Sequence, residues 1–164
     1  MKSGKIQIIK IEGFHSPYTT PPVPDLEEID GHDLPKSKQK WIRSILPDDD
    51  DVDKMSDKEK SELIYREFIR RLRGYWFMNN GEPTYITGDY YFYLTYWFIG
   101  AITKDGYPEY RKANRDWMYV VDFCEKDRNC MGLIAMCQKR DGKTERHLST
   151  LYNRATLIDE NCLF

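Results

Sequence analysis

The stretch GLIAMCQKRDGKTERHLSTLYNRA, residues 132–155, decides the fold class that this sequence predicts. It begins with a short apolar run, which is typical of a strand buried on both faces of a parallel sheet. A charged turn follows, and residues 143–155 then have the spacing of an amphipathic helix. The apolar side of that helix carries three residues, namely Leu148, Leu151 and Tyr152. The order of strand, turn and helix predicts an α/β protein.

The charged turn contains the residue types that a phosphate-binding loop needs. In such a loop Gly142 permits a close backbone approach, Lys143 neutralises the β- and γ-phosphates, and Thr144 ligates Mg²⁺. Lys139 and Arg140 add positive charge at the helix N-terminus, which is unfavourable unless an anion binds there. The full pattern G-x-x-x-x-G-K-[ST] also requires an earlier glycine, and cysteine stands in its place. An exposed basic turn therefore remains the alternative to a nucleotide site.

Residues 1–55 are predicted to be an extended arm followed by a linker. KIQIIKIEGF, residues 5–14, alternates as one short strand does, and the prolines of residues 17–24 exclude a helix. WIRSIL, residues 41–46, is predicted to form a short helix. The aspartates at 48–51 lack the alternating ligands and the turn glycine of a calcium loop, so a solvated linker is expected there.

Residues 56–130 are predicted to form a mainly helical subdomain. Ser56 and Glu59 have the spacing of a capping box, and Gly74 is suited to end the helix that follows. The apolar residues of this helix recur at helical spacing: Leu63, Ile64, Phe68 and Leu72. Its other face carries cations, for which a solvated surface is favoured over a surface that tracks DNA. These cations are Lys58, Lys60, Arg66, Arg70, Arg71 and Arg73.

The most aromatic part of the chain is NNGEPTYITGDYYFYLTYWFIGAI, residues 79–102. A turn, a short strand and then a helix over 90–99 are predicted, with Thr87 or Asp89 as the helix cap. Because that helix is apolar on all sides, we expect a buried core element, and a stacking platform for bases is the alternative. A third helix is predicted over 109–126. The helical spacing places three of its residues on one face: Trp117, Val121 and Cys124.

The composition is that of an intracellular chain outside the membrane. The net charge is −2 and the mean hydropathy is −0.72, so there is no global basic field that would indicate nucleic acid. The cysteines lack the spacing of zinc ligands, and reduced thiols are expected. The sequence contains no recognisable signal peptide and no stretch long enough to span a bilayer. We therefore expect no membrane partner and no secretion.

Three segments together resemble the large terminase subunits of phages, in particular those of crAss-like phages. KRDGKT after a strand is similar to the deviant Walker A motif of these DNA-packaging ATPases, in which a basic residue precedes G-K-[ST] and the leading glycine is often replaced. GYWFMNNGEPTYITGDYYFYLTYW and YRKANRDWMYVVDFCEKD, upstream of it, resemble the same family. The similarity runs from about Ser56 to the end of the chain, and residues 1–55 contribute nothing to it.

The resemblance implies a motor that hydrolyses ATP to translocate DNA into a procapsid, with a two-metal nuclease in a C-terminal part. On this basis residues 131–164 would be the first strand, phosphate loop and helix of a P-loop NTPase whose sheet is parallel. The implied catalytic residues are Lys143 and the cis-acting cation of the loop, which is Arg140 or, failing that, Lys139. The implied nucleotide contacts are Asp141, Gly142, Lys143, Thr144 and Glu145, and Thr144 is also the implied ligand of Mg²⁺.

The same resemblance implies partners and a location. Double-stranded DNA would be bound through its backbone, with Arg66, Arg70 and Arg73 as candidates, so binding would be sequence-independent and weakened by salt. The portal, a small terminase subunit and further copies of the chain would complete the motor in the host cytoplasm, transiently at the procapsid. Candidates for the adenine pocket are the rings of residues 85–96 together with Arg111 and Arg115.

The chain departs from the family in the residues that would hold Mg²⁺ and activate water. A P-loop ATPase needs a second strand that ends in carboxylates, and TLIDE lies too close to the loop to supply it. Asp159 and Glu160 are therefore expected to be loop residues, and the chain is expected to be an N-terminal piece without hydrolysis of its own. Two alternatives remain: a fragment of another P-loop or helicase-like ATPase, and a non-enzymatic interaction module with an accidental G-K-T.

Overall fold

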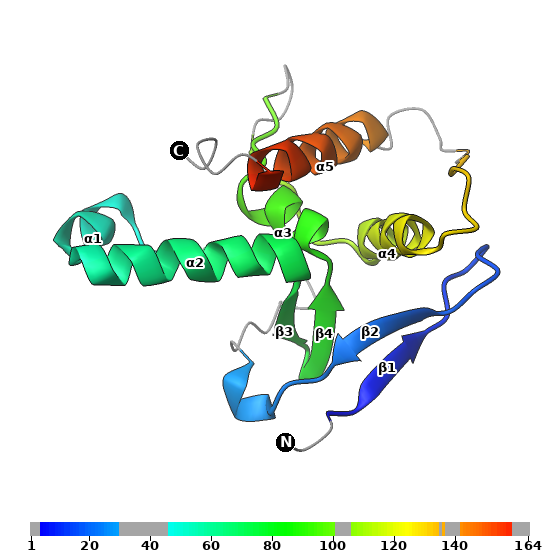
Figure 1. The fold of residues 1–164 in the computed structure, drawn as a ribbon, viewed down its shortest axis with the longest axis horizontal. Coiled ribbons are helices and arrows are strands. Elements are labelled where there is room, and N and C mark those ends of the chain that lie inside the picture. Colours follow the sequence, from blue (N-terminus) through cyan, green and yellow to red (C-terminus); the bar gives the residue numbers. More distant parts are fainter. Residues whose placement is uncertain (1–3, 30–45, 101–105, 135, 137–141, 159–164) are drawn as a thin grey trace.

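The computed structural model describes residues 4–29, 46–100, 106–134, 136 and 142–158. These residues form helices and two small antiparallel sheets, each a pair of strands (Figure 1). The strands are β1 (Ile6–Ile9), β2 (Tyr18–Pro22), β3 (Tyr75–Asn79) and β4 (Glu82–Ile86). The helices are η1 (Leu26–Glu28), α1 (Asp49–Lys54), α2 (Asp57–Arg73), α3 (Gly88–Thr95), α4 (Lys112–Lys126) and α5 (Lys143–Ile158). The prediction of a chain with both helices and strands is confirmed.

The long helix α2 begins and ends where the sequence predicts. The Ser56 hydroxyl accepts from the Glu59 amide at 3.4 Å, and the Glu59 carboxylate accepts from the Ser56 amide at 2.8 Å. This is the predicted capping box, which satisfies two amides that the first turn leaves without partners. At the other end Gly74 has a φ of +87°. A Cβ there would lie 2.3 Å from the Tyr85 hydroxyl, so glycine is required both by conformation and by space.

A tight hairpin connects α2 to α3. Strands β3 and β4 pair antiparallel, and the turn between them places Asn80 at a φ of 54° and Gly81 at a φ of 82°. Two successive residues with positive φ are the mark of the type I′ turn, whose twist matches that of the flanking strands. The turn and β4 were predicted from the sequence. Strand β3 was not.

Helix α3 is short and almost completely enclosed. The Thr87 hydroxyl accepts from the Tyr90 amide at 3.3 Å, so Thr87 rather than Asp89 is the cap. The helix ends at Thr95, earlier than the predicted Ile99. Its start packs tightly on the end of α2, because a Cβ at Gly88 would lie 1.9 Å from the Arg71 carbonyl oxygen. Figure 1 shows α3 between α5 on one side and the β3–β4 hairpin on the other.

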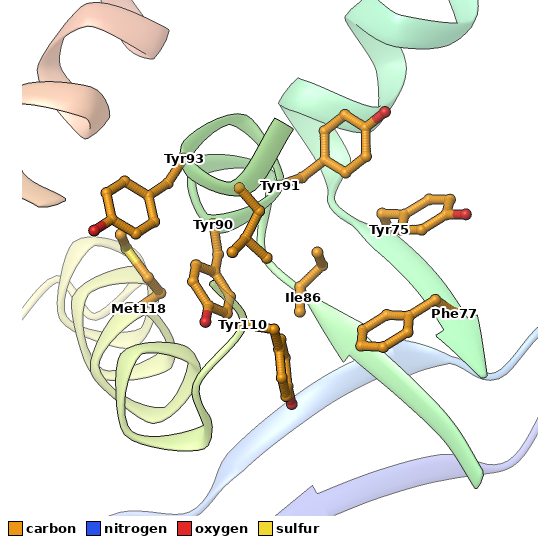
Figure 2. Close-up of a cluster of buried hydrophobic side chains, with 9 residues drawn as sticks. Tyr75, Phe77, Ile86, Tyr90, Tyr91, Tyr93, Tyr110 and Met118 are labelled. Atoms are coloured by element: carbon orange, nitrogen blue, oxygen red, sulfur yellow. The ribbon is translucent and has the colours of Figure 1, made fainter. Parts of the chain in front are cut away.

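Aromatic rings form the main hydrophobic core, as predicted for this helix. Tyr90 and Tyr91 of α3 are fully buried, and Figure 2 shows them on either side of Ile86. The Tyr90 ring reaches toward Tyr110 and α4, whereas Tyr91 points toward α2, and its ring lies 5.2 Å from that of Tyr75 in β3. The alternative of a platform for stacking bases does not fit these rings, since a buried ring presents no open face.

The N-terminal arm is packed more closely than the sequence predicts. Strand β1 is found as expected, and β2 pairs with it antiparallel. Tyr18 of β2 is buried, stacks on Tyr119 of α4 at 4.2 Å and donates a hydrogen bond to Asp122 at 2.7 Å. Beyond the one strand expected in this arm, the structure therefore contains a second strand and a buried anchor at Tyr18. A side chain with a ring and a hydroxyl can anchor even a strand that proline has shortened.

Three further expectations concern short segments. Residues 49–54, predicted to be linker, form the exposed helix α1, with aspartates at the helix N-terminus where negative charge is favourable. Most of the helix predicted at 41–46 lies outside the described residues. No strand is found at 132–137 as far as that run is described, and both sheets of the described residues are antiparallel. The expectation of a parallel sheet starting at this run therefore has no counterpart in the described fold.

Candidate functional site

The G-K-T triplet lies at the open start of a long helix. Gly142 has a φ of +68°, and its carbonyl accepts from the Arg146 amide at 3.2 Å as α5 begins. Lys143 and Thr144 are exposed in the first turn. This helix boundary is the one that the sequence predicts. The remaining loop residues of the predicted site, among them Lys139, Arg140 and Asp141, lie outside the described residues.

Glu145, the last residue of the predicted nucleotide site, is held by the protein itself. Its Oε2 accepts from the indole N–H of Trp97, which lies just beyond α3, at 2.8 Å. A carboxylate in the first turn of a helix is stabilised by the helix dipole, and here the indole also fixes its position. The start of α5 is therefore tied to the segment that follows α3.

The face of α5 that points into the molecule is polar. Its buried residues are Arg146, Ser149, Asn153 and Thr156. Asn153 accepts a hydrogen bond from Arg71 of α2 at 2.9 Å and donates one to Asp89 of α3 at 2.9 Å. Buried polar groups are tolerated only when they are hydrogen-bonded, and here each bond also joins α5 to another element. We call these residues, with Arg71 and Asp89, the polar interface of α5.

The polar interface extends into α2 through a buried carboxylate. Glu67 accepts from the hydroxyls of Tyr91 at 2.5 Å and Tyr96 at 2.9 Å and from the Arg70 guanidinium at 2.8 Å. Burial, together with the neighbouring charge of Glu67, raises the pKa of Tyr91. Burial lowers the pKa of Arg71. The face of α2 that contacts the core is thus charged, which is the opposite of the predicted arrangement.

The apolar residues noted on α5 lie on its exposed side, and those of α2 are divided between exposed and half-buried positions. On α5, Leu148 is 48% exposed, Leu151 65% and Tyr152 56%. On α2, Leu72 is 54% exposed. The four inward residues of α5 recur at helical spacing at positions 146, 149, 153 and 156, but polar residues with this spacing are equally typical of an exposed face. Amphipathic analysis ranks faces by hydrophobicity, so it does not identify a polar face as the buried one.

The cations predicted to contact DNA differ in how far they are free to do so. Arg66 and Arg73 are exposed. Arg70 is partly buried, ion-paired with Glu67, and lies over the Tyr75 ring at 4.8 Å. Arg71 belongs to the polar interface, so the prediction of a solvated cationic face is wrong at this position. An incoming phosphate would have to compete with these internal partners for Arg70.

The candidates for the adenine pocket are mostly engaged elsewhere. The rings of residues 85–95 lie in the core, where the largest exposed fraction among them is 5%. Arg115 pairs with Asp116 at 2.9 Å and lies over the Tyr119 ring at 5.4 Å. Arg111 is exposed, but its backbone holds the Tyr90 hydroxyl through two hydrogen bonds. A pair of rings that the sequence did not predict lies near the start of α5: the ring centroids of Trp117 and His147 are 5.7 Å apart.

The described residues contain neither a cluster of metal ligands nor a helix that could cross a membrane. Among these residues, no group of three or more His, Cys, Asp or Glu side chains could hold a metal ion. That result has no bearing on Thr144, since a P-loop supplies one hydroxyl and the nucleotide phosphates supply further ligands. In the same part of the chain, none of the helices combines the length and apolar character needed to cross a bilayer.

Comparison with known proteins adds no assignment to this geometry. No protein-family model, no curated protein and no solved structure matches the chain. The function has to be inferred from the residues and contacts described above.

Proposed function

We propose that this chain is the N-terminal part of a terminase large subunit, a viral DNA-packaging ATPase that binds ATP and Mg²⁺ and translocates double-stranded DNA into a procapsid. The observation that carries the proposal is the position of G-K-T at the start of α5. Gly142 adopts a left-handed conformation, and Lys143 and Thr144 are exposed in the first turn of a 16-residue helix. The resemblance of the surrounding segments then selects the family.

The start of α5 has the elements that bind a nucleotide phosphate. The first amides of a helix have no intrahelical acceptors, and the helix dipole adds positive potential there. Lys143 supplies a mobile ammonium for the β- and γ-phosphates, and the Thr144 hydroxyl supplies a ligand for Mg²⁺. Arg140, or Lys139 in its absence, would stabilise the charge that develops during phosphoryl transfer, although lysine lacks the forked contact of arginine.

The outward apolar side chains also support this proposal. Met131 is 99% exposed, Ile134 96% and Met136 100%, and Leu151 of α5 is exposed as well. Large apolar side chains that are exposed to this extent often mark a surface that another element covers. In a P-loop ATPase the run at 132–137 would be the first strand of a parallel sheet, and α5 would pack on that sheet. The portal, the small subunit and other copies of the chain remain partners by resemblance.

The test is nucleotide binding, because hydrolysis by this chain alone is not expected. A fluorescent ATP analogue is titrated with and without Mg²⁺ against the full chain and its variants. Lys143→Ala should weaken binding by about tenfold or more, a loss of about 1.4 kcal/mol. Thr144→Ala should remove the effect of Mg²⁺, whereas Thr144→Ser should keep it. Lys58→Ala, another exposed lysine near a helix start, should bind as the parent does.

One alternative is favoured by a specific observation. If the full chain does not bind the analogue, or if Lys143→Ala binds it as the parent does, the ATPase proposal fails. The outward apolar face of α5 would then indicate an interaction module without enzymatic activity. In that case Leu151→Lys, and not Lys143→Ala, should abolish binding to the partner.

A further inference from the structure

Two cysteines meet where α4 ends. The helix ends at Lys126, and the Cys130 amide then donates to the Asp127 carbonyl at 3.0 Å. The Asn129 amide donates to the Asp127 carboxylate at 2.9 Å, which stabilises the same turn. This reversal returns the chain to the last turn of α4. It brings Cys130 next to Cys124, although six positions separate them.

The two thiols share one accessible site. Both cysteines are free and half-buried, and the Cys130 thiol lies close enough to Cys124 to affect the pKa of the Cys124 thiol. The Cys130 thiol also contacts the Gly132 carbonyl oxygen at 3.4 Å. Both residues line an open cavity of about 480 Å³, whose wall also includes the cation Arg128. The carboxylates of Glu125 and Asp127 line it as well, so a small reagent has space beside the sulfurs without an excess of positive charge.

We propose that Cys124 and Cys130 form a redox-active dithiol, which closes to an intramolecular disulfide by exchange with a low-molecular-weight disulfide such as oxidised glutathione. Exchange needs two sulfurs that can reach each other and access for the reagent, and the shared cavity provides both. The inference goes beyond the proposed ATPase function and does not depend on it. Its local effect would be to tie residue 130 to the last turn of α4.

The order of the two steps follows from the surroundings of the sulfurs. Burial, together with the neighbouring Cys130 thiol, raises the pKa of Cys124 to about 11. Since the thiolate is the nucleophile, Cys130 attacks first, forms a mixed disulfide and releases one glutathione thiolate. Cys124 then loses its proton and attacks the Cys130 sulfur, and the second glutathione leaves. The protein gives up two electrons and two protons in total, and oxidised glutathione takes them up as two thiols.

The experiment uses the full chain with Cys137→Ser and Cys162→Ser, so that the two cysteines of interest are the only ones left. This protein is equilibrated in glutathione buffers of graded redox ratio, quenched with acid and analysed intact and after trypsin. The expected product is lighter by two hydrogen atoms. Its digest should contain peptide 116–126 linked to peptide 129–139, since trypsin cuts between the two cysteines. A melting curve confirms that the chain is folded.

Matched controls keep the proposal falsifiable. Cys124→Ser in the same background should gain one glutathione instead of an internal bond, and it should need a redox ratio at least tenfold more oxidising. That factor reflects the local concentration of the second thiol in the parent. The proposal is overturned if both cysteines of the parent take up glutathione separately. It is also overturned if the wild-type chain with Cys130→Ser forms an internal link to Cys124 as readily as the parent does, because Cys137 or Cys162 would then be the preferred partner.

Discussion

The ring core around α3 and the polar interface of α5 bury side chains by opposite means. In the core, rings such as Tyr90 and Tyr91 are removed from water, and their hydroxyls find acceptors or donors at the edge. At the polar interface, the groups between the helices are Arg71, Asn153 and Asp89, while Leu151 faces solvent. The first region gains stability from apolar area. The second gains little net energy but defines one arrangement, since every partner must be in place.

The comparison shows that α5 is attached to the rest of the molecule by groups that are costly to leave unpaired. A hydrogen bond between buried groups contributes modestly, but an orphaned buried group costs more. The position of α5, and with it the G-K-T triplet, therefore depends on a few specific bonds. The ring core depends less on specific bonds, because contacts between rings survive small displacements that would break a hydrogen bond.

The largest expected effect is loss of the core at alkaline pH. Burial raises the pKa of several tyrosines above the ordinary value near 10: Tyr18, Tyr85, Tyr90, Tyr91, Tyr96, Tyr110 and Tyr119. The unfolded chain releases these protons first, so stability is fully present below about pH 10 and falls as the pH rises further. Each group contributes a slope of about 1.4 kcal/mol per pH unit. Urea midpoints between about pH 8 and 11 measure it.

A single variant tests this origin of the pH dependence. Tyr90→Phe should reduce the slope above about pH 10 by the share of one tyrosine, and it should leave the slope below that pH unchanged. The difference in tyrosinate absorbance between the parent and Tyr90→Phe should appear only together with unfolding, because exposed rings such as Tyr65 contribute equally to both. If that difference appears in the folded chain near pH 10, the Tyr90 ring is not enclosed as described.

The next effect is the deletion of one core ring. Tyr90 is fully buried and its hydroxyl bonds to the Arg111 carbonyl at 2.9 Å. Tyr90→Ala should lower the free energy of unfolding by about 3–5 kcal/mol, measured by urea denaturation at neutral pH. Tyr90→Phe keeps the ring and should cost only about 1–2 kcal/mol. Equal losses in the two variants would assign the stability to the hydroxyl, which would contradict the ring core.

A smaller effect is expected at the polar interface. Arg71→Ala leaves Asn153 without the donor that lies 2.9 Å away, and it removes the bond to Thr156. The free energy of unfolding should fall by about 2–3 kcal/mol. Hydrogen exchange should accelerate in α5 more than in α3, because α5 loses its tie to α2. Arg66→Ala, on the exposed side of the same helix, should change stability by less than about 0.5 kcal/mol.

The smallest effect is expected for the exposed apolar residues of α5. Leu151 is 65% exposed, so Leu151→Ala should change the free energy of unfolding by less than about 0.5 kcal/mol. The matched change on the inner face is Ser149→Leu, where the serine is fully buried, and it should cost about 1–3 kcal/mol through overpacking. If Leu151→Ala lowered the free energy of unfolding more than Ser149→Leu does, the apolar side of α5 would have to face the core.

Features that depend on neighbours in sequence were predictable. The cap of α2 needs only Ser56, Glu59 and the intervening turn, and the hairpin turn needs only Asn80 and Gly81. The start of α5 at Lys143 and the burial of α3 also follow from local composition. The core position of Tyr18 was not predicted, because its contact with Tyr119 joins residues that are far apart in the chain.

The sequence by itself determined the cap of α2, the start of α5, the turn between β3 and β4 and the enclosure of α3, because each of these is settled by groups within about one turn of one another. Only the tertiary structure decided which face of α2 and of α5 points inward. The bond from Arg71 to Asn153 spans 82 positions, and neither helix alone indicates that its polar side will find such a partner. A polar face can be buried only when its groups find hydrogen-bond partners there, and those partners belong to the neighbouring helix.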